Sequence, residues 1–223
     1  MEKLSLVHLV RQPLVKSASP PLLLLLHGVG SNEYDLFGLA PYLDKRFLII
    51  SVRAPYTLGS DSFAWFEINF TPQGIIIQPE QAEASRNKLI TFLNEAVTTY
   101  GANPRQVYLM GFSQGAIISA SVALTRPELV AGLVMMSGRI LPQIEPLMAA
   151  PEKLKGLPVL VVHGTADTVL PVEHGRASRK TLSALPVDLL YREYPMGHEV
   201  SQESLDDVTS WLSAHLDAGG YET

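Results

Sequence analysis

The chain contains no cysteine. This absence excludes disulfide bonds, metal sites built on thiolates, CxxC redox chemistry and a cysteine nucleophile. It is compatible with a reducing cytosol but does not require one, since secreted proteins can also lack cysteine. Any covalent catalysis by a side chain must therefore use a group other than a thiol.

An excess of positive charge is absent as well. The 223 residues carry 17 Lys and Arg against 22 Asp and Glu, a formal net charge of −5 at pH 7. No cluster of Lys or Arg appears, whereas a nucleic-acid-binding protein normally presents a basic face. The sequence therefore predicts no nucleic-acid partner.

Long apolar runs are missing too. The longest near the N-terminus is Leu22–Leu26, far short of the roughly 20 residues that a membrane-spanning helix needs. Residues 1–13 lack the basic segment and apolar stretch of a secretory signal. These absences predict a soluble, cytoplasmic protein without stable membrane insertion.

What the chain has instead is ample material for a core, with 47% hydrophobic and 17% charged residues. Its length, and the lack of an internal repeat or linker, predict one domain over residues 1–223. Several apolar runs of strand length end in turns that mostly contain glycine: 22–26, 47–52, 106–110, 129–136 and 159–162. Their continuous apolar character is typical of strands buried on both faces of a parallel sheet.

Helical patterns alternate with these runs, and their expected ranges are 79–100, 114–125, 172–184 and 201–216. Two further strands are expected, an edge strand at Leu4–Val10 and another at Val187–Tyr194. This alternation predicts an α/β fold with a mostly parallel, doubly wound sheet flanked by helices. The aromatic-rich stretch Pro55–Gln78 fits it poorly, and we expect a long loop with a short hairpin there.

The segment Gly111-Phe112-Ser113-Gln114-Gly115 matches G-x-S-x-G, with a strand-like run before it and a helix-like run after it. That context predicts a sharp turn holding the Ser113 hydroxyl above the sheet at the start of a helix. The alternative is an ordinary turn between a strand and a helix. We interpret Ser113 as a nucleophile.

A serine nucleophile needs a histidine base and a carboxylate that orients the imidazole, and in this fold they follow in the order Ser, acid, His. His198 lies in a turn between a strand and the last helix, so it is the predicted base. His174 and His215 fall on helices, where surface positions are expected. Asp167, in a turn after a strand, is the predicted acid. It is favoured over the other candidates, which are Glu173, Asp188, Glu193 and Glu199.

Acyl transfer also needs preset backbone N–H donors for the oxyanion. The predicted donors are Gln114, which follows the nucleophile, and Val29, in the glycine-rich loop after an early strand. A dinucleotide-binding loop is the rival interpretation of Gly28 and Gly30, but the third glycine of that motif is missing. No metal site is predicted, because no cluster has metal-ligand spacing. His27 and His163 are interpreted as residues that orient turns.

Four segments together resemble the phospholipase/carboxylesterase family of α/β-hydrolases, which includes acyl-protein thioesterases. They are the loop 26–30, the elbow 111–115, the segment 163–171 and the Gly197-His198 pair, and the likeness runs from Leu22 to Leu216. The resemblance implies a single-domain α/β-hydrolase fold without a large lid domain. It implies a serine esterase without metal or organic cofactor, acting on a small-molecule ester or acyl substrate.

Substrate choice stays open among carboxylic esters of short to medium chain, thioesters of acylated proteins and lysophospholipids. Phe63, Trp65 and Phe66 resemble the family's Trp-Phe-acid motif and, with residues 135–141, are candidates to line an apolar acyl channel. The alternative for them is ordinary core packing, or a surface that makes a homodimer. Gly30-Ser31-Asn32-Glu33 departs from the Gly-Asp of thioesterases, which favours a carboxylesterase. A non-catalytic ligand-binding protein and a carbon–carbon or peracid-forming hydrolase are the other classes.

Overall fold

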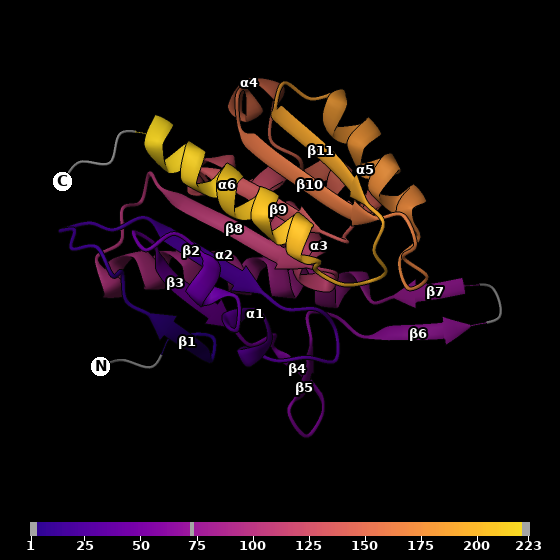
Figure 1. The fold of residues 1–223 in the computed structure, drawn as a ribbon. Helices are drawn as coiled ribbons and strands as arrows, with labels where there is room; N and C mark the ends of the chain where they lie inside the picture. Colours follow the sequence, from indigo (N-terminus) through magenta and orange to yellow (C-terminus); the bar gives the residue numbers. More distant parts are fainter. Residues whose placement is uncertain (1–3, 72–73, 220–223) are drawn as a thin grey trace.

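One central sheet organises the computed structural model, which describes residues 4–71 and 74–219 (Figure 1). Its strand order is β1-β3-β2-β8-β9-β10-β11. All neighbouring strands are parallel except β1 and β3. The strands are β1 His8–Arg11, β2 Leu22–Leu26, β3 Leu48–Val52, β8 Val107–Phe112, β9 Gly132–Met136, β10 Pro158–Gly164 and β11 Asp188–Tyr194. The predicted mostly parallel sheet is confirmed.

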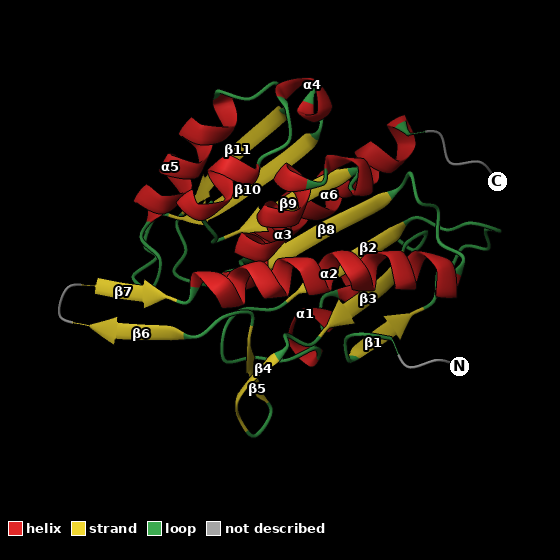
Figure 2. Ribbon diagram, turned by 180° about the vertical axis from the view of Figure 1, so that it is seen from behind, coloured by secondary structure: helices red, strands yellow, loops and turns green. Residues whose placement is uncertain are grey.

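Helices cover both faces of this sheet (Figures 1 and 2). On one face lie α2 Pro79–Tyr100, α3 Gln114–Thr125 and α5 Val172–Ser183; on the other lie α1 Tyr34–Phe37 and α6 Gln202–Ala218. The ranges of α2 and α3 are those predicted, and the ends of α5 and α6 differ by one or two residues. Shorter pieces complete the chain: η1 Ala40–Tyr42, η2 Pro127–Leu129, η3 Pro142–Leu147 and α4 Pro151–Leu154.

Strand β2 shows why continuous apolar runs become central strands. All five of its leucines are fully buried. Leu22, Leu24 and Leu26 pack into the core on the α2 and α3 face, while Leu23 and Leu25 pack into the core on the α6 face. Because alternate side chains of a strand point to opposite faces, a strand covered on both faces needs no polar position.

Two of the expected strands are shorter in the structure. The edge position of the first strand is confirmed, but it covers His8–Arg11 rather than Leu4–Val10. The run 129–136 forms a strand only from Gly132, because Pro127 starts a turn of 3₁₀ helix that ends at Leu129. Proline fits the first position of a helical turn, since no helical partner is available there for an N–H.

The region 55–78 forms two hairpins, so the expectation of a single short hairpin is wrong. Strand β4 Tyr56–Gly59 pairs with β5 Ser62–Ala64, and β6 Ile68–Thr71 pairs with β7 Gly74–Ile77. Asp61, between β4 and β5, has φ 54°, a left-handed conformation that Asp tolerates better than most residues. Figure 1 shows β6 and β7 away from the central sheet.

The connections reverse direction at β2, which makes the carboxyl ends of β2 and β8 a topological switch point. From β2 the chain moves to its neighbour β3, then crosses back to β8 on the other side of β2. The loops that leave the carboxyl ends of β2 and β8 therefore diverge, and such a switch point is where open α/β sheets bind ligands.

Among the described residues, no helix has the length and apolarity to cross a membrane.

Candidate active site

Ser113 lies at the switch point, on the turn between β8 and α3. Its backbone has φ 53° and ψ −118°, and a non-glycine residue in such a region costs about 1–3 kcal/mol. The flanking glycines make the turn possible. A Cβ on Gly115 would lie 2.0 Å from the carbonyl oxygen of Leu26, and one on Gly111 would lie 2.4 Å from the backbone of Gly115. The elbow geometry predicted from G-x-S-x-G is therefore present.

The structure brings Ser113, His198 and Asp167 together. His198 Nε2 lies 3.0 Å from Ser113 Oγ, and His198 Nδ1 lies 2.7 Å from Asp167 Oδ2. Since an ionised carboxylate only accepts hydrogen bonds, Nδ1 carries the proton and Nε2 is left to accept the Ser113 proton. Asp167 is 5% exposed. The geometry is that of a nucleophile, a base and an orienting acid.

Asp167 is held by the turn that carries it. Its Oδ1 accepts the backbone N–H groups of Val169 at 2.9 Å and Leu170 at 2.8 Å. His163 lies 3.5 Å from the other carboxylate oxygen, and its Nε2 donates to the carbonyl of Leu170 at 2.7 Å. These bonds fix the carboxylate toward His198, and they support the interpretation of His163 as a residue that orients the turn.

Phe112 was missed by the sequence reasoning. Its ring centroid lies 4.9 Å from that of His198, and a Cβ on Gly28 would lie 3.3 Å from the Phe112 ring. Phe112 therefore packs between the imidazole and the loop after β2. The available signal was its position beside the nucleophile in G-x-S-x-G, at the carboxyl end of a central strand.

The loop that carries Val29 lies beside the nucleophile. A Cβ on Gly28 would be 3.3 Å from Ser113 Cβ, so the glycine permits a close approach. Gln114 is the first residue of α3, and its N–H therefore has no acceptor within the helix. Within the described part of the chain, no hydrogen bond is made by the Val29 N–H. Two unpaired donors thus flank the turn that carries Ser113 Oγ, as an oxyanion site requires.

Strand β5 holds this loop in place. Gly30 donates its N–H to the carbonyl of Phe63 at 2.8 Å, and Phe63 donates its own to Ser31 at 2.9 Å. Gly30 has φ 84°, a left-handed conformation that favours glycine. The hairpin of β4 and β5 thus has a structural part in the site, which the sequence did not indicate.

Trp65 and Phe66 pack in the core, with exposed fractions of 0% and 1%, and Phe63 is 8% exposed under the Arg53 guanidinium. The burial of these three side chains favours core packing over an open acyl channel or a surface contact. In the adjoining candidate stretch, Met135 and Met136 are also fully buried, inside β9. This part of residues 135–141 does not line a channel.

The side chain of Gln114 fixes the Trp65-Phe66 segment. Its Oε1 accepts the backbone N–H of Trp65 at 2.9 Å, and its Nε2 donates to the carbonyl of Phe66 at 2.8 Å. The Trp65 indole donates to the carbonyl of His27 at 3.0 Å. Residue 114 therefore joins the start of α3 to a loop that lies almost 50 residues away in sequence.

His27 orients the turn after β2, as the sequence analysis proposed. Its Nδ1–H donates to the carbonyl of Gly28 at 2.7 Å, and its Nε2 accepts the N–H of Ala54 at 3.0 Å. Burial holds the pKa of His27 below its usual range, so the ring is neutral at pH 7. Both ring nitrogens are engaged, which excludes proton transfer to substrate by this residue in the observed arrangement.

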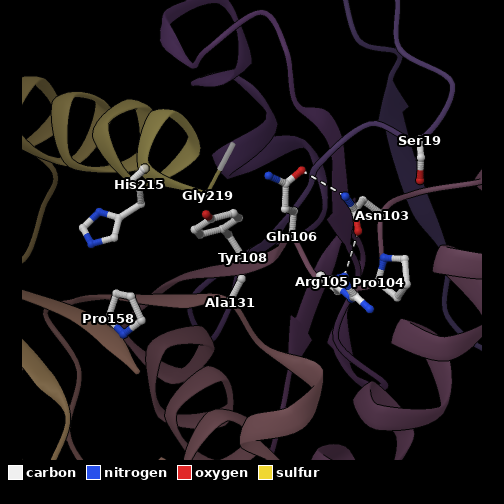
Figure 3. A pocket seen from close by; sticks show the side chains of 11 residues that line it. Ser19, Asn103, Pro104, Arg105, Gln106, Tyr108, Ala131, Pro158, His215 and Gly219 are labelled. Atoms are coloured by element: carbon white, nitrogen blue, oxygen red, sulfur yellow. Dashed lines mark hydrogen bonds between the residues drawn. The ribbon is translucent and has the colours of Figure 1, made fainter. Parts of the chain in front are cut away.

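A cavity lies elsewhere in the molecule, away from Ser113. This cavity of about 600 Å³ lies at the opposite edge of the sheet, where β8 and β10 begin, and Figure 3 shows its lining residues. There His215 stacks on Trp211 at 4.0 Å and donates to the carbonyl of the same residue at 2.8 Å. In the residues that the structure describes, no group of three or more His, Asp or Glu side chains is placed to hold a metal.

Comparisons with known proteins found relatives among carboxylesterases and acyl-protein thioesterases. The family model described as phospholipase/carboxylesterase matches residues 13–216. A protein of Oryza sativa subsp. japonica named as a probable inactive carboxylesterase is 26% identical, over 88% of this chain and 85% of its own. Acyl-protein thioesterase 1 of Kluyveromyces lactis is 27% identical, over 87% and 92%. The crystal structure of esterase PE8 superposes with a TM-score of 0.85 at 28% identity, over 95% of this chain and 99% of its own.

Proposed function

The chain belongs to the phospholipase/carboxylesterase family, and we propose that it is a serine carboxylesterase that hydrolyses short- to medium-chain carboxylic esters. The observation that carries the proposal is the hydrogen-bonded series from Ser113 through His198 to Asp167 at the sheet's switch point. A binding protein has no need of all three groups in this order. The α/β-hydrolase arrangement, shared with solved esterases, is the scaffold on which the family performs ester hydrolysis.

In the proposed reaction Ser113 Oγ attacks the ester carbonyl while His198 Nε2 takes its proton. The N–H groups of Val29 and Gln114 stabilise the oxyanion, and Asp167 stabilises the imidazolium. His198 then gives the proton to the departing alcohol, which leaves an acyl group on Ser113. A water molecule, activated by the same histidine, releases the acid and restores the serine.

A panel of esters tests the proposal. It varies the acyl length, the leaving group, and oxygen against sulfur at the scissile bond. Wild-type protein should hydrolyse oxygen esters of short to medium chain, and Ser113→Ala protein, purified free of host esterases, should not. Equal hydrolysis by both proteins would sink the proposal. Faster turnover of thioesters or lysophospholipids would move the substrate class to the alternatives.

One relative is named as inactive, so non-catalytic ligand binding is the second candidate. The presence of all three triad groups within hydrogen-bond distance in this chain speaks for activity. Substrate contact by Phe63, Trp65 and Phe66 remains a prediction, and their burial speaks against it. The cytoplasmic location, the single-domain extent over residues 1–223 and a homodimer also remain predictions.

A further inference from the structure

Arg139 lies in the segment that follows β9, next in sequence to a glycine that packs against the elbow. It follows Gly138, where a Cβ would lie 2.5 Å from Ala116 Cβ and 3.4 Å from the carbonyl oxygen of Ser113. The next residue, Ile140, donates its N–H to Ser178 Oγ of α5 at 3.0 Å. The half-buried Arg139 is thus held between the elbow and the first turns of α5. It interrupts the otherwise apolar stretch that follows β9.

The Arg139 guanidinium has no acidic partner in the described part of the chain. Its Nε is buried and makes no hydrogen bond. Burial lowers its pKa, and no carboxylate acts in the opposite direction. Glu173, on the first turn of α5, is turned toward Arg176, 3.8 Å away. A partly buried, unpaired cation is costly, so its place beside a reactive serine calls for an anion from outside the chain.

Other arginines of the molecule show the contrast. Five of them lie within 4.0 Å of a carboxylate oxygen. These are Arg46, Arg53, Arg86, Arg126 and Arg176. Arg126 and Arg176 are exposed, whereas Arg46, Arg53 and Arg86 are half-buried like Arg139 and are paired all the same. Arg139 therefore differs from the other half-buried arginines of this group, because it has no carboxylate partner among the described residues.

His174 is the second member of the same corner. It lies on the first turn of α5, and its carbonyl accepts the Ser178 hydroxyl, which itself accepts the N–H of Ile140, the residue after Arg139. The charges of Arg139, His163, Glu173 and Asp167 all act on His174. Burial first, and then the Arg139 charge, hold the pKa of His174 below its usual range, so its ring is neutral at pH 7. The ring makes no hydrogen bond to any described residue, and a neutral imidazole offers one N–H donor.

We propose that Arg139 and His174 bind a carboxylate carried by the ester substrate. An arginine fork matches a carboxylate in geometry, and the neutral His174 N–H adds one further donor. The corner has one fixed positive charge, which matches a singly charged carboxylate better than a phosphate dianion. The preferred substrates are therefore half-esters of dicarboxylic acids. This inference rests on the proposed esterase function and specifies its substrate class.

The test compares two esters of the same size, monoethyl glutarate and its neutral amide analogue ethyl glutaramate. Proton release at constant pH gives kcat and KM for each. Wild-type protein should prefer the charged ester. Arg139→Gln should reduce the ratio of the two kcat/KM values by about tenfold to a hundredfold, the range of a charge-assisted hydrogen bond, mainly through KM. Arg139→Lys should keep part of the ratio, because it keeps the charge.

Arg105→Gln is the matched control. Arg105 is exposed at the opposite edge of the sheet, and its loss changes the net charge equally, so the ratio should stay within about twofold of wild type. Half-esters of succinate and adipate vary the distance between the ester carbonyl and the carboxylate that would meet the guanidinium. An ethyl ester that ends in a phosphate tests whether the site prefers a singly charged group. Preference for the phosphate over every half-ester would contradict the carboxylate assignment.

The results separate this inference from the proposed function. If wild-type protein hydrolyses the amide analogue in a Ser113-dependent way without preferring the half-ester, the carboxylate site is wrong and the esterase stands. An equal loss on both esters in Arg139→Gln protein would make Arg139 structural. If Arg139→Gln protein does not fold, the ratio of the two kcat/KM values in wild-type and Arg139→Lys protein still tests the carboxylate site. Hydrolysis of neither ester at any chain length would overturn the esterase itself.

Discussion

The two edges of the central sheet differ in how their polar groups are arranged. At the carboxyl edge, Ser113, His198 and Asp167 form one directed series of hydrogen bonds. At the amino edge, a cavity of about 600 Å³ is lined by polar groups that bond one another, such as Asn103 with Gln106 at 3.2 Å (Figure 3). Among the residues that line this cavity, no serine is hydrogen-bonded to a histidine. The series from Ser113 to Asp167 therefore distinguishes the carboxyl edge from the amino edge.

Helix direction explains the difference in part. In a parallel α/β sheet the helices begin at the carboxyl edge, and α3 begins at Gln114, directly after Ser113. The positive end of a helix dipole favours negative charge that develops there. Helix α6 ends at the amino edge, where Gly219 lines the cavity, so carbonyl groups face that side. Acyl transfer, which builds up an oxyanion, suits only the first edge.

The largest expected effect comes from removing the nucleophile. Ser113→Ala should lower kcat by about 10⁴- to 10⁶-fold, because attack and proton transfer are lost while the oxyanion donors remain. Ser19→Ala, the same change at the cavity, should alter kcat by less than about twofold. Steady-state kinetics on a short-chain ester compare the two. A comparable loss of kcat in the two variants would contradict the assignment of the nucleophile to the carboxyl edge.

Asp167→Asn should lower kcat by about 10⁴-fold, because an amide no longer holds the His198 proton on Nδ1. The matched control is Asp188→Asn, at the exposed amino end of β11. This variant should retain wild-type kcat within about twofold. A small effect at Asp167 and a large one at Asp188 would reverse the assignment of the acid.

A change of stability tests the tight packing of the elbow. Gly115→Ala should cost about 3 kcal/mol or more of unfolding free energy, because its Cβ would meet the rigid carbonyl of Leu26 at 2.0 Å. Gly59→Ala, where no atom lies within 4 Å of the new Cβ, should change it by less than about 0.5 kcal/mol. Urea unfolding measures both. Similar stability of the two variants would show that the elbow has room to relax.

The smallest effect is expected from an ion pair that ties the chain together near the amino edge. Arg46 bonds Asp44 at 2.8 Å and Asp217 of α6 at 2.6 Å. The Arg46 guanidinium lowers the pKa of Asp44 from 3.8 to about 2. This stabilisation is therefore present above pH of about 4 and is lost as the pH falls toward 2.

Asp44→Asn should reduce the unfolding free energy by about 1–2 kcal/mol at pH 7. The difference from wild type should shrink below pH of about 4, because the wild-type carboxyl is then protonated in the unfolded state. Urea unfolding at several pH values measures this. A difference that grows on acidification would contradict the stated sign.

The sequence was informative where local rules apply. Pro79 and Gly101 mark the ends of α2, and the chain order of Ser113, Asp167 and His198 was enough to select three residues that meet in space. Glycine spacing in the elbow predicted the turn, because the steric need for glycine is local.

Contacts between segments that are distant in the sequence could not be predicted from it. The backbone bonds between Phe63 and the loop after β2, and the bonds from the Gln114 side chain to Trp65 and Phe66, leave no pattern in the chain. Arg139 lies within residues 135–141, for which the sequence predicts an apolar channel. Only the fold shows that no described carboxylate pairs with its guanidinium. His174 was assigned to the surface because a helical position alone does not reveal its neighbours.

Covalent labelling tests the central claim most directly. A fluorophosphonate reacts when an activated serine oxygen attacks phosphorus and fluoride leaves. Intact-mass measurement should show one adduct for each wild-type chain, peptide mapping should locate it on Ser113, and Ser113→Ala protein should stay unlabelled. An unlabelled wild-type protein, or equal labelling of the Ser113→Ala protein, would contradict the assignment of Ser113 as the nucleophile.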